Sequence, residues 1–167
     1  MVDLINIEEV RLKFVDELSY AMDREDLRPK DVSDYCRISQ NNFSNYLQGK
    51  SLPNLWVMVL ISDLLECTVN ELLDYEEADE DELVGYDPFT TFEDEEEFTY
   101  HVRNRLEQYM AHSGNGVKEL SEKTGFNPRT IRRWLGMSKN GPELPRTSDF
   151  LVICDALGTT PSDLLGY

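Results

Sequence analysis

Three arginines, Arg129, Arg132 and Arg133, lie within the short stretch "NPRTIRRWLGM" of residues 127–137. Arginine can bind the O6 and N7 atoms of guanine through two hydrogen bonds, or it can neutralise a phosphate. Residues 39–50, "SQNNFSNYLQGK", form a stretch of similar shape that carries amides instead of arginines. Gln and Asn are the side chains that bind adenine through two hydrogen bonds. Both stretches are therefore chemically suited to contact bases, with different preferences.

The chain around these stretches is strongly acidic, and its charge is unevenly distributed. It has 167 residues, a formal net charge of -17 and a sequence pI near 4.4. Residues 76–97 hold twelve acids and no Lys or Arg, whereas residues 1–75 carry -7 and residues 98–167 carry +2. The acidity belongs mainly to a central segment, so the three arginines lie in a mildly basic part of the chain.

The two stretches belong to two copies of one repeated unit. Residues 51–75 align with residues 143–167 at an offset of 92, with identities such as Pro53 with Pro145. Upstream the offset becomes 88, because the loop "GMSKNGPELP" contains a four-residue insertion. Self-similarity at a fixed offset is typical of a tandem repeat. We predict an N-terminal domain over residues 1–75, an acidic linker over 76–97 and a C-terminal domain over 98–167.

Each copy has the pattern of short helices. Apolar residues recur at helical spacing, and no sustained alternation of apolar and polar residues indicates a strand. Asn127 followed by Pro128 is typical of a helix start, and "TVNE" and "TPSD" resemble capping boxes. The sequence therefore predicts an all-α fold with two small five-helix bundles. Trp134 and Ile131 would face the core of the second bundle, which leaves the arginines on the outer face.

The complete units resemble the lambda-repressor/Cro-like (XRE-type) helix-turn-helix DNA-binding domains, twice in tandem. The resemblance runs through "VKELSEKTGFNPRTIRRWLG" and "SDFLVICDALGTTPSDLLG" in the second copy. In the first copy it runs through "VSDYCRISQNNFSNYLQGKSLPNLWVMVLISDLLECTVNELL". It covers nearly all of the chain outside residues 76–97. The resemblance implies that the second helix of each motif lies in the major groove of DNA.

The resemblance and the predicted helix faces give two sets of candidate site residues. The candidates for base contacts are Arg129, Thr130, Arg132 and Arg133 in the second copy, and Gln40, Asn41, Ser44 and Asn45 in the first. The candidates for phosphate contacts are Arg28, Lys30, Lys50, Lys118 and Lys139, together with one or more helix N-termini.

The sequence also departs from the family pattern. The family often has glutamine at the start of the first motif helix, whereas this chain has Pro29 and Val117 there. The usual glycine of the turn is Gly125 in the second copy but Arg37 in the first. A residue other than glycine is strained there if the turn requires a positive φ. For these reasons, and because of its charge, we expect the second copy to be the stronger DNA-binding unit.

The acidic segment allows two interpretations. It can be a solvated linker, whose 22 residues as flexible coil would span roughly 25 Å. Half-sites one helical turn apart lie about 34 Å from each other, so one chain could span them as a covalent pseudo-dimer. A homodimer of two such chains is the other arrangement that the sequence allows. Alternatively, the segment docks onto the arginine surface or onto a partner protein through its apolar residues, which are Leu83, Val84, Tyr86, Phe89 and Phe92.

The leading hypothesis is a sequence-specific double-stranded DNA-binding transcriptional regulator with two unlike recognition helices. The alternative is a protein-interaction module, either a co-regulator or a mobile-element inhibitor, that keeps the fold and binds a basic partner through its acidic surface. No catalytic motif supports an enzyme, and neither a cofactor nor a metal site is expected. No stretch is apolar enough to span a membrane, and the N-terminus lacks a basic signal region. A cytoplasmic location follows from these features and from the cysteine pattern.

Overall fold

The computed structural model describes residues 5–75 and 92–166, and this part of the chain contains helices and no strand. The helices are, in chain order, α1 (Ile7–Arg24), α2 (Pro29–Cys36), α3 (Gln40–Leu47), α4 (Leu55–Leu64), α5 (Val69–Leu73), α6 (Glu95–His112), α7 (Val117–Thr124), α8 (Pro128–Trp134), α9 (Thr147–Leu157) and α10 (Pro161–Leu165). The predicted all-α fold, with five helices in each repeat, is confirmed.

The helices reproduce the two offsets of the sequence repeat. Helices α6, α7 and α8 begin 88 residues after α1, α2 and α3, and helices α9 and α10 begin 92 residues after α4 and α5. The four additional residues therefore fall between α8 and α9, in the predicted loop. Helix α6 begins at Glu95, which lies within the segment that the sequence assigned to the acidic linker.

Side chains at the helix starts explain why the boundaries fall where they do. The Asn54 side chain accepts a hydrogen bond from the Val57 N–H at 2.9 Å, which caps α4. Thr68 and Thr160 cap α5 and α10 in the same way, accepting from the Glu71 and Asp163 N–H groups. These bonds satisfy amides that have no partner within a helix. The two threonine caps lie in the predicted "TVNE" and "TPSD" starts.

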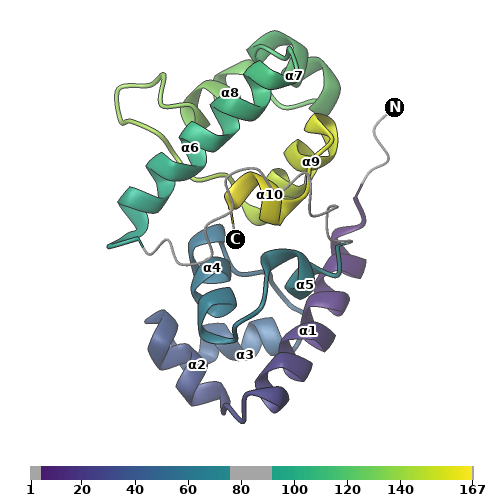
Figure 1. Ribbon diagram of the computed structural model, residues 1–167, viewed down its shortest axis with the longest axis vertical. Coiled ribbons are helices and arrows are strands. Elements are labelled where there is room, and N and C mark those ends of the chain that lie inside the picture. Colours follow the sequence, from purple (N-terminus) through teal and green to yellow (C-terminus); the bar gives the residue numbers. More distant parts are fainter. Residues whose placement is uncertain (1–4, 76–91, 167) are drawn as a thin grey trace.

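The two repeats meet through their last helices. Figure 1 shows α4, α5, α9 and α10 in the middle of the molecule, with α1–α3 at one end and α6–α8 at the other. The Asn70 N–H donates to the Ser162 hydroxyl at 2.8 Å, and the Ser162 N–H donates to the Asn70 Oδ1 atom at 2.8 Å. Asn70 and Ser162 occupy equivalent positions of the two repeats. Such reciprocal contacts define an isologous interface, so an approximate two-fold axis relates the repeats.

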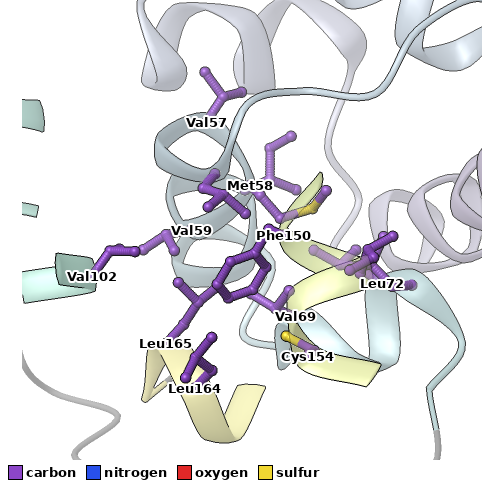
Figure 2. Close-up of a cluster of buried hydrophobic side chains, with 14 of the residues drawn as sticks. Val57, Met58, Val59, Val69, Leu72, Val102, Phe150, Cys154, Leu164 and Leu165 are labelled. Carbon is purple, nitrogen blue, oxygen red and sulfur yellow. The ribbon is translucent and has the colours of Figure 1, made fainter. Parts of the chain in front are cut away.

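An apolar core surrounds this polar contact and is continuous between the repeats. Figure 2 shows Met58 and Val69 of the first repeat beside Phe150 and Leu165 of the second. These four side chains are at most 1% exposed and belong to one cluster of buried residues. The ring centroids of Trp56 and Phe98 add a contact at 5.4 Å between α4 and α6. Because the repeats bury apolar surface against each other, the hydrophobic effect holds them together.

Candidate nucleic-acid interface

Each repeat contains two helices joined by a three-residue turn. In the first repeat the turn between α2 and α3 begins at Arg37, and in the second the turn between α7 and α8 begins at Gly125. Both residues have left-handed backbone, with φ of 54° at Arg37 and 80° at Gly125. The turn therefore requires the positive φ that the sequence suggested, and Arg37 adopts it without being glycine.

Helix α3 carries its candidate residues on a polar face opposite a buried aromatic side chain. The helix is capped by the Ser39 hydroxyl, which accepts from the Asn42 N–H at 3.0 Å. Phe43 is buried and anchors the opposite face. Of the four candidates for base contact in this helix, the first two are exposed and the last two are half-buried; in order they are Gln40, Asn41, Ser44 and Asn45. The Ser44 hydroxyl accepts a hydrogen bond from the Gln48 side chain at 2.9 Å, so it is already engaged.

The arginines of α8 are exposed, and they differ in their partners. Asn127 caps the helix by accepting from the Arg129 N–H at 2.9 Å, and Ile131 is fully buried beneath it. Arg129 and Arg132 form no ion pair with any described residue. Arg133 lies 3.8 Å (Nε to Oε2) from Glu143, in the inserted loop.

Glu143 is therefore the acid that faces the arginine helix. Its backbone N–H also donates to the Arg133 carbonyl at 3.0 Å. Both side chains of the pair are 47% exposed, so solvent weakens the attraction between them. Thr130, the remaining candidate in this helix, is half-buried.

The candidates for phosphate contact divide into one engaged arginine and four exposed lysines. The Arg28 guanidinium donates to both carboxylate oxygens of Asp31 at 3.1 Å, and these hydrogen bonds lower the pKa of Asp31. The lysines are exposed and form no ion pair with described residues; they are Lys30, Lys50, Lys118 and Lys139.

Carboxylates occupy the starts of the first motif helices. Asp31 accepts from the Arg28 N–H at 2.9 Å at the start of α2, and Glu119 accepts from the Gly116 N–H at 2.9 Å at the start of α7. A negative charge at these positions already complements the helix dipole, and it repels an approaching phosphate. Among the helix N-termini that the sequence offered for phosphate contacts, those of α2 and α7 are therefore poorly suited to them.

Most of the proposed docking segment lies outside the described residues, namely Leu83, Val84, Tyr86 and Phe89. Phe92 is described and is half-buried. Its ring centroid lies 5.3 Å from that of Phe98 and 4.8 Å from that of His101, so it packs on α6 of its own chain.

Sequence reasoning missed the residues that join the two repeats. Asn70 is fully buried and Ser162 is 2% exposed, although both are polar. The Asn70 Nδ2 group also donates to the Thr160 hydroxyl at 3.0 Å. A polar residue at the same repeat position in two short apolar helices was the available signal. The partner of each residue becomes clear only once the repeats are placed against each other.

The fold and these helices define an all-α protein with two helix-turn-helix units. Residues 17–78 and residues 105–167 each match the family of Cro/C1-type HTH DNA-binding domains. The two matches together cover more than half of the chain, and the chain belongs to this family as a tandem, XRE-type protein. A search of curated proteins and a search of solved structures gave no match.

Two further observations concern the described part of the chain. No group of three His, Cys, Asp or Glu residues within it is arranged to hold a metal ion. None of its helices is both long enough and apolar enough to cross a membrane.

Proposed function

We propose that this chain is a sequence-specific transcriptional regulator that binds double-stranded DNA through α3 and α8 at once. The observation that carries the proposal is the placement of these two helices. They lie at opposite ends of the molecule in Figure 1, and both are among the fainter helices on its more distant side. A two-fold relation puts equivalent helices on the same side of the body, as binding to one face of a duplex requires.

The two helices present different chemistry to the duplex. Arg129 and Arg132 favour guanine, whereas Gln40 and Asn41 favour adenine. A symmetric operator would satisfy only one of them at both half-sites. We therefore propose that the operator is asymmetric, with one guanine-containing and one adenine-containing half-site. The contact between the repeats sets the distance between the half-sites, with α5 packed against α10.

The proposal is tested by selecting bound duplexes from a random pool at low salt and measuring affinity for the selected site. Replacing Arg129 and Arg132 by alanine should weaken binding roughly tenfold or more, because one two-bond contact to a base is worth about 1–3 kcal/mol. The matched control is Lys13→Ala, since Lys13 of α1 is already paired with Glu9 of the same helix and with Asp74 at the end of α5. The same change at Lys13 should leave affinity nearly unchanged.

A second variant tests the arginine surface by strengthening DNA binding instead of weakening it. Glu143→Gln removes the acid beside Arg133, so we expect tighter binding by a few-fold, with a steeper dependence on salt. If the wild-type chain binds no duplex in a salt-sensitive manner, the DNA-binding proposal fails. Capture of a basic protein partner by the same chain would then favour the interaction module.

A further inference from the structure

The C-terminal end of the recognition helix α8 is fastened by a side chain of another helix. The Arg103 guanidinium of α6 donates from its Nε atom to the Leu135 carbonyl at 3.2 Å, where α8 ends. Its Nη1 atom donates to the Asn104 side chain at 2.8 Å, which orients the guanidinium. Arg103 is half-buried, and Leu135 is 5% exposed. A cation at this end of a helix also complements the helix dipole.

The inserted loop binds the same end of α8. The Met137 N–H donates to the Arg132 carbonyl at 2.9 Å. The Glu143 N–H donates to the Arg133 carbonyl at 3.0 Å. Main-chain carbonyls near the end of a helix have no partner within that helix, so these bonds replace the missing ones. The last turn of α8 is thus bound both by the loop that follows it and by Arg103 of α6.

Helix α8 depends on such contacts because it is short. It has seven residues, and isolated helices of fewer than about 12–15 residues are marginal in water. Its inner face is held by the buried side chains of Ile131 and Trp134. Arg129 and Arg132 project from the outer face. Two hydrogen bonds to one base form only when the helix aligns the planar guanidinium with that base, so recognition by these arginines requires a well-placed helix.

Apolar side chains occupy the same place in the first repeat. At the offset of 88, Val15 of α1 is the equivalent of Arg103. Likewise, Leu47 at the end of α3 is the equivalent of Leu135. The Val15 side chain has no hydrogen-bond donor, and its Cγ2 atom lies 3.5 Å from where a Cβ atom on Gly49 would be. Apolar contacts have no preferred direction, whereas the hydrogen bond to the Leu135 carbonyl imposes one.

We propose that Arg103 is a positioning residue that aligns α8 for the recognition of guanine. This inference rests on the proposed function, because it assumes that Arg129 or Arg132 binds a base. Loss of the bond to the Leu135 carbonyl lets α8 shift, so its arginines lose their alignment with the base but keep their charge. Attraction to phosphates survives such a shift, because it depends on charge and not on the direction of a bond. Arg103 therefore governs base discrimination by α8 more than the overall affinity for DNA.

The test replaces guanine by 7-deazaguanine in the guanine-containing half-site, which removes the N7 acceptor and leaves base pairing intact. Wild type should bind this duplex about fivefold or more weakly than the selected duplex, because one of two hydrogen bonds to the base is lost. Arg103→Met keeps the apolar stem and removes the donors, and its ratio should fall below about twofold. The penalty for 7-deazaadenine in the other half-site should not change. Arg103→Lys retains a charged donor and should restore part of the guanine penalty.

The matched control is Arg105→Met, because Arg105 lies on the same helix and forms the same kind of bond with another element. Its guanidinium donates to the Leu164 carbonyl at 3.0 Å and also to the Asp163 carbonyl, near the end of α10. Arg103 and Arg105 are both half-buried, so the two substitutions remove similar groups from similar surroundings. Arg105→Met should leave the guanine penalty unchanged. Hydrogen exchange in the free protein should become faster in α8 for Arg103→Met and in α10 for Arg105→Met.

Several results would overturn the inference. If Arg103→Met keeps the penalty for 7-deazaguanine while Arg129→Ala reduces it, Arg103 does not position α8 and the proposed function stands. If both methionine variants bind both duplexes more weakly by one common factor, Arg103 contributes only stability. If Arg103→Met alone lowers the slope of log affinity against log salt by about one, Arg103 contacts a phosphate directly.

Two further controls keep the result interpretable. Thermal unfolding establishes that each variant is folded at the assay temperature. If Arg103→Met is not folded, Arg103→Val takes its place, because the first repeat has valine at the equivalent position. A wild-type chain that binds no duplex in a salt-sensitive manner would overturn the proposed function itself, and the inference with it.

Discussion

At the scale of single residues, the two repeats differ at the positions where the backbone is left-handed. Among the described residues, four other than glycine have positive φ, all of them in the first repeat, and the second repeat has glycine at each equivalent position. The pairs are Asp26 with Gly114, Arg37 with Gly125, Glu66 with Gly158, and Asp74 with Gly166. Left-handed backbone costs a residue with a Cβ atom about 1–2 kcal/mol. The first repeat therefore contains backbone strain that the second one avoids.

Replacing Arg37 by glycine tests this difference in the turn of the first motif. We expect the free energy of unfolding to rise by about 0.5–1 kcal/mol, because relief of the left-handed strain exceeds the chain entropy that glycine loses on folding. Arg37→Ala keeps the Cβ atom and should give no such gain. Gly125→Ala should lose about 1 kcal/mol, since its Cβ atom would meet no neighbour within 4 Å and only the φ penalty remains. Urea unfolding measures all three, and a stabilising Arg37→Ala would contradict this explanation.

At the scale of helices, much of the fold could be predicted from the sequence, because local residues decide where a helix starts and which of its faces is buried. The threonine caps of α5 and α10 and the buried face of α8 depend on residues a few positions apart, and the repeat offsets can be read by aligning the chain with itself. The partner of Asn70 could not be predicted in this way, because it depends on how the repeats pack. Likewise, the pairing of Arg133 with Glu143 depends on the path of the inserted loop.

The contribution of the contact between α5 and α10 to the stability of the protein can be measured. Asn70→Ala leaves the buried Ser162 N–H without its acceptor, and Ser162→Ala leaves the Asn70 N–H without its acceptor. A buried amide without a partner costs about 1–3 kcal/mol, so each variant should be destabilised by that amount. Asn41→Ala, on the exposed face of α3, should stay within about 0.5 kcal/mol of wild type. Chemical unfolding gives these values, and near-neutral results at both buried positions would show that the bonds do not hold the repeats together.

At the scale of the whole molecule, the position of the exposed acids of α1 bears on how DNA approaches the recognition helices. The exposed acids of α1 include Glu8, Glu9, Asp16 and Asp23. Figure 1 places α1 on the nearer side of the molecule and draws α3 and α8 among its fainter, more distant parts. Salt at 0.15 M screens exposed charges beyond about 8 Å. Exposed acids that lie farther than this from α3 and α8 therefore act only weakly on DNA bound there.

The continuous core leads to a prediction about the spacing of the half-sites. If the contact between the repeats fixes α3 relative to α8, adding about 5 base pairs between the half-sites turns one of them to the opposite face of the duplex. Wild type should then lose at least about tenfold in affinity, because only one recognition helix can reach its bases.

The same experiment shows whether the contact between the repeats or the acidic segment sets the preferred spacing of the half-sites. Ten Gly and Ser residues inserted within 76–91 should not change the preferred spacing, whereas combining Asn70→Ala with Ser162→Ala should broaden it. Gel-shift titrations against a series of spacings measure both effects. A spacing preference that follows the inserted length instead would mean that the repeats bind DNA as two tethered domains, with the acidic segment and not the α5–α10 contact setting their separation.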